Sequence, residues 1–564
     1  MLCGARRDLA LESDVYAHSH CNMMYVVIQQ CMNHFISYFA ADQQVAMSFV
    51  LSLRWLTLVY CCKAWSLFDA KRAPPRSTQS LVEHLQRGPS RLNKDVSVVV
   101  VSHNECGIQF DGTWENKELA YVDRNEFVTS QCGRETQVGR AVQTYFSLHD
   151  DIREIHGNLL PSIYIAIFLC LTRQNKVSGG IHTPYLKTLP SLEALQHLPV
   201  FWDKQLLEEL QDSAVKSAVQ VRRNEWDEEY HIILEALQET GGNIVADFVN
   251  LETWYWARSI ITSRAFGDNK DDLCLIPYVD MMNHIGQDQA DSRGDVIKCG
   301  WKIDSSGFRL VLPEDMGNNS GEAKRIEISY GDNSNSNFLM NYGFSIVEDS
   351  QQTTENKAIL SLCLPLQQEA DQAMEILWEA DGLGDCHDVC RNVTVNIGNP
   401  GPMQSLLSLC RVASSQGPEL SSMQDAFVQK GETTSQTDDG LVPQLGATLC
   451  RSPFSVSNEI RAMERLQRVA SDCLCKYKTT LAEDETLLHR GFSRRRRWFG
   501  RQRDFHRLRN AVIVRRGEKQ IIQHFYNVAT LALSFLRMAN EDFEVYKGML
   551  GATLENDEPC YNLL

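Results

Sequence analysis

The sequence predicts an α+β protein in which a small-sheet domain, interrupted by a helical insert, is followed by an all-α domain. Short β-branched runs occur on both sides of a long stretch with helical periodicity, and helical periodicity dominates beyond Asp349. The chain has 564 residues, of which 43% are hydrophobic. At about 150 residues per domain, this length supports several domains with cores of their own, which excludes a disordered chain.

The predicted strands lie on both sides of the insert. Val96–Ser102 has the sequence VSVVVVS, a β-branched run between polar residues that is typical of a buried strand. Glu118–Val122 is a second short candidate. Further along the chain, RLVLP from Arg309 and RIEISYG from Arg325 each have the pattern of a strand that ends in a turn.

The predicted helices form the insert and the C-terminal domain. Apolar residues recur at spacings of three and four residues over Gln137–Arg173 and Leu206–Glu239, which indicates amphipathic helices. We therefore place the insert at about residues 137–250 of a first domain, 91–350, and the helical domain at 351–564. Within the latter, the polar interval Ser414–Gly446 is expected to be a loop.

The N-terminal residues 1–90 are assigned to a leader and linker. Val45–Cys62 is as long as a membrane span, but Arg54 at its centre costs about 2.5–3.5 kcal/mol on insertion scales. A pair of packed helices or a leader are the alternatives, and a membrane protein is not expected. The Pro-, Arg- and Ser-rich interval Lys71–Ser90 marks the first boundary.

Charge and cysteine content restrict the function classes. With 55 Lys and Arg against 72 Asp and Glu, the net charge of −17 disfavours a protein that coats nucleic acid along its whole length. The 18 cysteines include no CxxC pair, so no zinc ribbon or thiol redox motif is expected and no metal site is predicted. Scattered thiols in a long chain favour an intracellular protein, in cytoplasm or nucleus.

Unusual residues gather between Arg264 and Phe344. Pro277–His284 has the sequence PYVDMMNH, Ile326–Gly331 has IEISYG, and Asn341–Phe344 has NYGF. Each is weak alone, because a buried tyrosine is more often a core residue than a catalyst. In this order they resemble the C-terminal half of a SET domain of the Rubisco large-subunit methyltransferase type.

The C-terminal third carries the same resemblance. The segments YKTTLAEDETLL from Tyr477 and RNAVIVRRGEKQII from Arg509 are similar to the helical substrate-binding domain of that family. The resemblance implies an S-adenosylmethionine-dependent protein-lysine N-methyltransferase acting on a non-histone protein, which binds this substrate through its helical domain and is a monomer. It implies Tyr330 as the catalytic residue, with Cys106, Gly107, Asn283, His284 and Tyr330 at the cofactor and Arg264, Phe266, Asp280 and Tyr342 at the substrate lysine.

The chemistry fits these residue types. Methyl transfer needs a neutral amine, whereas a free lysine has a pKa of about 10.4. A nearby sulfonium and a desolvated channel both lower the pKa of the amine, so tyrosine hydroxyls and carbonyls can orient the nitrogen without a strong base.

Two features keep alternatives open. Where the family has Gly-x-Gly, this chain has Glu105-Cys106-Gly107, and the missing glycine would let backbone approach a ligand closely. A catalytically weak or inactive binding or scaffold protein is therefore the main alternative. Histidine-directed relatives lack a tyrosine at the position of Tyr342 and carry Asn near Phe266, so lysine is the favoured acceptor over histidine.

A basic run extends from Arg494 to Arg516, with Trp498, Phe499 and Phe505 interleaved. This spacing is compatible with phosphate contacts and base stacking, so a local nucleic-acid contact is one interpretation. A solvated face, a nuclear-import signal or a site for an acidic substrate tail are the others.

Overall fold

The computed structural model describes residues 75–102, 105–111, 118–241, 250–267, 273–285, 295–313, 323–331, 333–347, 356–363, 390–397, 400–416, 455–490 and 502–537. The predictions on Val45–Cys62 and on most of Ser414–Gly446 lie outside these residues. By its internal contacts the chain divides into two units. One comprises residues 1–75 and 98–107, and the other comprises 76–97 and 108–564.

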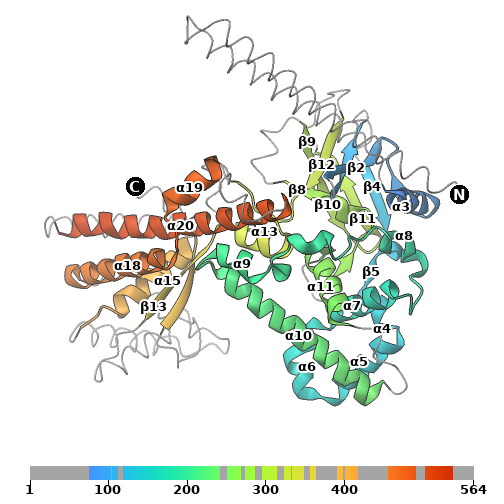
Figure 1. Cartoon of the computed structure of the whole chain (residues 1–564), viewed down its shortest axis with the longest axis horizontal. Helices are drawn as coiled ribbons and strands as arrows, with labels where there is room; N and C mark the ends of the chain where they lie inside the picture. Colours follow the sequence, from blue (N-terminus) through green and yellow to red (C-terminus); the bar gives the residue numbers. More distant parts are fainter. Residues whose placement is uncertain are drawn as a thin grey trace, which may run out of the picture. The chain divides into compact units, whose positions relative to one another are not determined.

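The described residues form four small sheets, three of which precede the C-terminal region (Figure 1). A four-stranded sheet has the order β1 (Arg91–Leu92), β4 (Glu118–Asp123), β11 (Gly307–Val311) and β10 (Gly300–Ile303). A second has the order β2 (Val96–Ser102), β3 (Glu105–Phe110), β12 (Lys324–Ile328) and β8 (Asn283–His284), with β9 (Val296–Lys298) also paired to β12. The third joins β5 (Val128–Thr129), β7 (Cys274–Leu275) and β6 (Ala265–Phe266). The predicted strands at residues 96–102, 118–122, 309–313 and 325–331 are confirmed.

The register of β12 positions the segment that follows it. Ile326 is paired antiparallel with Ile108 of β3, while Glu327 and Ile328 are paired in parallel with Asn283 and His284 of β8. Ile326 and Ile328 lie on one face of β12 and are both buried, so slippage by one residue would put the charged Glu327 in their place. The residues directly after both strands are therefore held side by side.

The insert is helical, as predicted, but is divided into more pieces than the periodicity suggested. Its α-helices are α5 (Gln137–Leu148), α6 (Asp150–His156), α7 (Leu160–Arg173), α8 (Thr183–Leu186), α9 (Lys204–Leu207) and α10 (Ala214–Thr240). Two further helices, α4 (Ser130–Arg134) and α11 (Leu251–Arg264), flank the residues assigned to the insert. Helix α3 (Arg76–Arg87) precedes the sheets. Short 3-10 turns interrupt the chain between them, notably η4 (Ala194–His197) and η6 (Glu208–Leu210).

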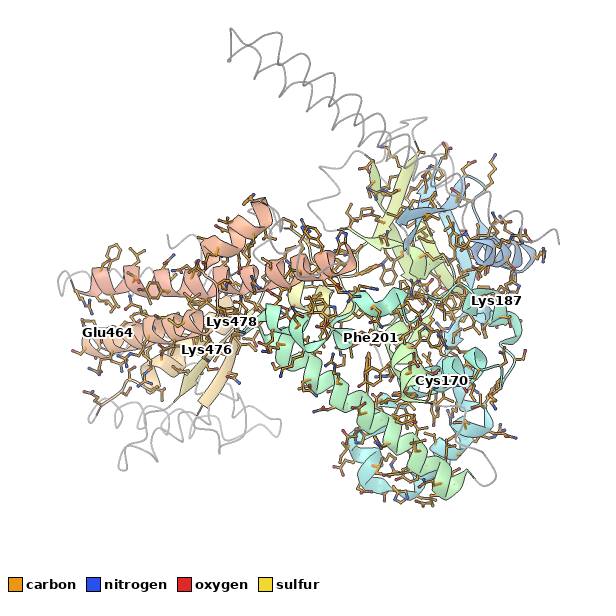
Figure 2. The ribbon with its side chains drawn as sticks, in the orientation of Figure 1. Cys170, Lys187, Phe201, Glu464, Lys476 and Lys478 are labelled. Atoms are coloured by element: carbon orange, nitrogen blue, oxygen red, sulfur yellow. The ribbon has the colours of Figure 1, made fainter. Side chains whose placement is uncertain are left out.

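Helix α7 is the most apolar helix of the insert. Among the described residues, the helical stretch Asp150–Arg173 is long and apolar enough to cross a membrane. Yet every residue from Ile163 to Leu171 is buried inside the protein, including Cys170, which Figure 2 labels. A helix that is apolar all round and enclosed by protein is a core helix.

The C-terminal region is mainly helical but not all-α. It contains α15 (Pro400–Val412), α18 (Val456–Lys476), α19 (Leu481–Arg490) and α20 (Gln502–Leu536), with α18 and α20 side by side (Figure 1). It also contains an antiparallel pair, β13 (Ala358–Cys363) and β14 (Cys390–Val395), which corrects the all-α prediction. The alternation in AILSLC buries Ala358, Leu360 and Leu362 on one face, against the helices.

Helix α20 also packs against the insert. Leu508, Ala511 and Val512 share a core with Leu206 of α9 and Val215 of α10. Between β12 and this region lies α13 (Asn335–Tyr342), which packs against α10, α11 and α20. The end of α13 therefore lies where the insert and the C-terminal region meet.

Candidate active site

Tyr330 is held at two points by the segment Met282–His284. Its backbone N–H donates to His284 Nδ1 at 3.0 Å, and its hydroxyl donates to the Met282 carbonyl oxygen at 2.6 Å. Because Nδ1 accepts, the proton of a neutral His284 imidazole is assigned to Nε2. Parallel pairing of β12 with β8 produces this arrangement, which was not visible in either motif alone.

Aromatic rings surround the tyrosine. The ring centroids of Tyr330 and Tyr342 are 4.7 Å apart, and those of His284 and Phe338 are 4.6 Å apart. Phe344 stacks on Phe338 with centroids 5.0 Å apart. The structure thus brings Tyr330, Tyr342 and His284 into one cluster, and burial raises the pKa of the Tyr342 hydroxyl.

Local sequence explains how α13 presents Tyr342. The Ser334 side chain caps the start of the helix by accepting from the Asn337 N–H, and Gly343 ends it in the left-handed conformation at φ 77°. A Cβ on Gly343 would lie 2.2 Å from Cδ2 of His197, so only glycine fits. The His197 ring, from the insert, therefore packs against Gly343, the residue that follows Tyr342.

Arg264 and Asp280 form an ion pair beside this cluster. Arg264 Nη1 donates to Asp280 Oδ2 at 3.1 Å and to the Asp280 carbonyl oxygen at 3.0 Å. The Tyr185 hydroxyl donates to the same Oδ2 at 2.9 Å. The Asp280 side chain is 1% exposed, and its burial raises its pKa despite both donors. Burial by itself would lower the pKa of Arg264. The attraction to the Asp280 carboxylate is larger than this effect, so the Arg264 pKa is raised.

Phe266 lies in a second aromatic group. Its ring meets Trp301 and Phe308 edge-on, with centroids 5.9 and 5.8 Å away. Phe308 is fully buried, whereas Trp301 is 42% exposed. Phe266 is two residues beyond Arg264, so this apolar group continues from the ion pair to the surface.

Asn283 has the character expected of a cofactor ligand. Its half-buried side-chain amide makes no hydrogen bond among the described residues, so a donor and an acceptor remain for polar groups of a ligand. An amide of this kind is suited to a group that carries both an ammonium and a carboxylate, such as the amino-acid portion of S-adenosylmethionine. Cys106, half-buried, and Gly107, buried, lie in β3 within the smaller unit, and their cofactor role stays a prediction.

Sequence reasoning missed two residues of this region, Tyr185 and His197. Tyr185 lies in the segment Thr183–Leu186 of the insert, far along the chain from both motifs. No spacing rule connects it to Asp280, because their contact depends on how the insert folds back. His197 gave no signal either, since a lone histidine in a turn is common.

The basic run is only partly described, and the described part removes one of its arginines from the residues that could contact phosphate. Arg515 is completely buried and bonded to Asp484, so it is not available for phosphate contacts. Arg507 pairs with Asp504 at 3.3 Å. Side chains from Arg494 to Arg503 lie outside the described residues.

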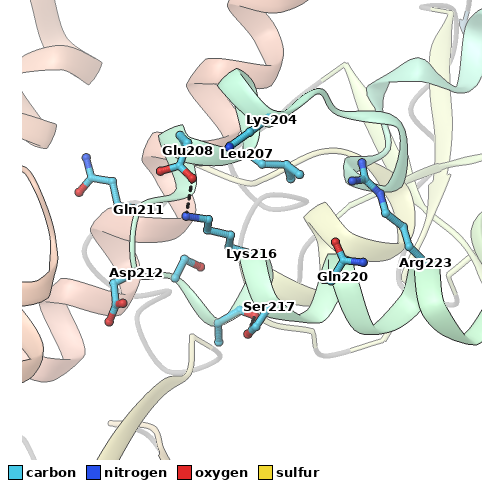
Figure 3. A pocket seen from close by; sticks show the side chains of 11 residues that line it. Lys204, Leu207, Glu208, Gln211, Asp212, Lys216, Ser217, Gln220 and Arg223 are labelled. Atoms are coloured by element: carbon cyan, nitrogen blue, oxygen red, sulfur yellow. Dashed lines mark hydrogen bonds and ion pairs between the residues drawn. The ribbon is translucent and has the colours of Figure 1, made fainter.

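A separate polar cavity of about 610 Å³ lies along α9, η6 and the start of α10 (Figure 3). Its lining includes Lys216, which pairs with Glu208 at 2.8 Å. None of the predicted site residues lines it. Among the described residues, no three His, Cys, Asp or Glu side chains are grouped to hold a metal ion.

The known proteins to which this chain is similar are methyltransferases. Residues 369–522 match the Rubisco LSMT substrate-binding family. The chain is 23% identical over 385 residues, covering 66% of it and 68% of the relative, to the chloroplastic ribulose-1,5 bisphosphate carboxylase/oxygenase large subunit N-methyltransferase of Pisum sativum. It is 24% identical over 375 residues, covering 65% and 68%, to the chloroplastic [fructose-bisphosphate aldolase]-lysine N-methyltransferase of Arabidopsis thaliana.

Histidine-directed relatives match as well. The actin-histidine N-methyltransferase of Homo sapiens is 23% identical over 405 residues, which cover 70% of this chain and 59% of that protein. Among solved structures, Rubisco LSMT bound to AdoMet superposes with a TM-score of 0.57 at 18% identity, covering 86% of this chain and all of that one. The LSMT SET domain bound to lysine and AdoHcy gives a TM-score of 0.57 at 18% identity, covering 85% and 98%.

Proposed function

The chain has the fold of a SET domain joined to a substrate-binding domain of the Rubisco LSMT type, and from this premise we propose that it is an S-adenosylmethionine-dependent protein N-methyltransferase. Its proposed acceptor is a lysine of a non-histone protein, and its proposed setting is inside the cell. The observation that carries the proposal is Tyr330, which is held by the Met282 carbonyl and His284 Nδ1 and whose ring centroid lies 4.7 Å from that of Tyr342.

The residues proposed to hold the cofactor are Asn283 and His284, with Cys106 and Gly107. The cofactor, when bound, supplies a methyl group on a positively charged sulfur. Similar solved structures contain AdoMet or AdoHcy, which supports this choice. Because the Asn283 amide has both donor and acceptor capacity to spare, it suits the paired charges of an amino acid.

The residues proposed to receive the lysine are Tyr330, Tyr342, Arg264, Phe266 and Asp280. The aromatic walls take the acceptor out of water, and desolvation disfavours a charged ammonium. This desolvation lowers the pKa of the lysine amine. Arg264 and Tyr185 both donate to Asp280 Oδ2, so this carboxylate is held in the wall of the site and is not proposed as a general base.

Lysine is proposed over histidine as the acceptor because of the two side chains Phe266 and Tyr342. Phe266 lies among Trp301 and Phe308 and offers no side-chain hydrogen bond to an imidazole. Tyr342 adds a second phenol beside Tyr330. Because some relatives methylate histidine, histidine is the alternative acceptor. Identifying the methylated amino acid in the product distinguishes lysine from histidine.

The deciding experiment uses the full chain with S-adenosylmethionine labelled in its methyl group, on proteins of a cell lysate. We expect labelled bands that Tyr330→Phe reduces by about 10²–10³-fold, as for loss of one preorganised donor. Acid hydrolysis of the bands should release methyl-lysine. Labelled methyl-histidine would overturn the choice of acceptor only.

Calorimetric titration with S-adenosylhomocysteine distinguishes an enzyme from a binding or scaffold protein. Saturable binding in both wild type and Tyr330→Phe, with transfer lost only in the variant, supports an enzyme. No binding by the wild type would mean that Glu105-Cys106-Gly107 fails to accommodate the cofactor, and the binding or scaffold function would replace catalysis. The helical C-terminal domain is the proposed substrate-holding surface in either case.

A further inference from the structure

One fully buried hydroxyl of the insert reaches the acceptor side of the site. Tyr185 lies in α8 and is 1% exposed. Lys187, the residue directly after this helix, marks its place in Figure 2. Its hydroxyl donates to Asp280 Oδ2 at 2.9 Å. The other carboxylate oxygen, Oδ1, has no hydrogen-bond partner among the described residues. Asp280 therefore depends on two side-chain donors, Tyr185 and Arg264, for its position.

Asp280 in turn positions the carbonyl that receives the Tyr330 hydroxyl. Asp280 lies in the 3-10 turn η8 (Val279–Met281), and Met282 follows directly. Arg264 donates hydrogen bonds to both the side chain and the backbone carbonyl of Asp280. Since η8 has only three residues, a shift of Asp280 moves the Met282 carbonyl with it. The Tyr330 hydroxyl, 2.6 Å from that oxygen, would follow.

The backbone before η8 makes this support necessary. Tyr278 has φ 70°, a conformation that side chains rarely adopt, and its own buried hydroxyl has no partner among the described residues. The turn is thus strained on its N-terminal side. Contacts from other elements must hold it, and Tyr185 and Arg264 provide these contacts at Asp280.

We propose that Tyr185 is a positioning residue for the methyl-acceptor site, acting through Asp280 and η8 on the Met282 carbonyl and Tyr330. This rests on the proposed function for its catalytic consequence, but the geometric coupling is independent of it. The helical insert is then part of the site's support rather than a passive cover. Its effect on methyl transfer would be on orientation, not on cofactor binding.

The test is nuclear magnetic resonance of the full chain labelled with ¹³C at Cζ of tyrosine. The Tyr330 resonance is assigned by its loss in Tyr330→Phe. In Tyr185→Phe we expect the Tyr330 resonance to shift. The matched control is Tyr145→Phe, which removes another tyrosine hydroxyl bonded to a carboxylate, that of Glu235 at 3.2 Å, elsewhere in the insert. It should leave the Tyr330 resonance in place.

Activity supplies the second readout. We expect Tyr185→Phe to lower kcat about tenfold, less than the about 10²-fold of a 1 Å misplacement, with unchanged affinity for S-adenosylhomocysteine. Tyr145→Phe should leave kcat unchanged. If Tyr185→Phe does not fold, Asp280→Asn replaces it, since the hydroxyl then meets a neutral acceptor and the same resonance should move.

The outcomes are separable from those of the proposed function. An unmoved Tyr330 resonance in a folded Tyr185→Phe protein overturns the positioning role, whatever the wild type does to protein substrates. A moved resonance together with a wild type that transfers no methyl group supports the coupling and overturns the proposed function. Equal shifts in Tyr185→Phe and Tyr145→Phe would also overturn the inference, since they would show a general response of the insert.

Discussion

Two buried aspartates have opposite electrostatic environments. Asp280 lies at the candidate site, and Asp484 lies in α19, close to the junction of the C-terminal region with the insert. Asp484 is bonded by Arg515 Nε at 3.0 Å and Nη2 at 2.6 Å, and by Lys519 Nζ at 2.7 Å. Its side chain is fully buried, yet these two cations outweigh burial and lower its pKa. Asp280 faces one cation and one hydroxyl, and burial raises its pKa.

The difference shows how donor number decides what a buried carboxylate does. Two cations with good geometry satisfy both oxygens of Asp484, so its charge locks α19 against α20. Asp280 keeps one oxygen without a partner among the described residues. We infer that the first aspartate serves stability and the second serves positioning.

Asp484→Asn should have the largest effect on stability. It would leave Arg515 and Lys519 buried beside a neutral amide, and the free energy of unfolding should fall by about 3–5 kcal/mol. Urea denaturation measures this. Asp504→Asn, which loses a half-buried pair with Arg507 on the same helix, is the control and should cost about 1 kcal/mol or less. A loss of similar size in both variants would refute the contrast.

Glu518 lies next to this junction. We expect its contribution to the free energy of unfolding to depend on pH with the opposite sign to that of Asp484. It accepts from the hydroxyls of Ser213 at 2.8 Å and Tyr477 at 3.0 Å, and burial raises its pKa to about 7. A raised pKa means that the folded state holds the proton more tightly. The stabilisation is full below the unfolded pKa of about 4.3 and is lost as the pH rises through the folded pKa.

Glu518→Gln should remove this loss. Between pH 5 and pH 8 the wild type should lose a few kcal/mol of unfolding free energy more than the variant does. Denaturation curves at both pH values give the difference. Glu229, whose pKa burial also raises to about 7, is present in both proteins and cancels in the comparison. Parallel pH profiles would show that Glu518 does not titrate in this window.

Asp280→Asn should cost less than Asp484→Asn. Arg264 keeps its bond to the Asp280 backbone carbonyl, and the Tyr185 hydroxyl can donate to the amide oxygen. We expect a loss of about 1 kcal/mol in stability. Methyl-transfer activity should fall more than stability, because orientation at Met282 is disturbed. A loss as large as that of Asp484→Asn would remove the distinction between the two aspartates.

Tyr278→Phe should have the smallest effect. Its hydroxyl is buried without a partner among the described residues, and burial raises its pKa. Removing an unsatisfied polar group is nearly neutral or stabilising, so the melting temperature should stay within about 2 °C of the wild type. A clear loss of stability would reveal an unseen partner for this hydroxyl.

Much of the fold could be predicted because its signals are local. The β-branched run at Val96–Ser102 and the apolar segment Leu160–Arg173 specify a strand and a helix from their own composition. The C-terminal β13–β14 pair was missed, since helical neighbours on both sides masked two short strands. Arg515 was assigned to a surface run, because charge in sequence does not show burial.

The sequence by itself determined which residues are present to do chemistry: Asn283-His284, Tyr330 and Tyr342, in motifs whose order and spacing identify the fold. Only the tertiary structure decided their contacts. Parallel pairing of β8 with β12 brings His284 to Tyr330, and the folded insert brings Tyr185 to Asp280 across 95 residues. Such contacts depend on strand register and helix packing, which are long-range properties, so no local pattern can encode them.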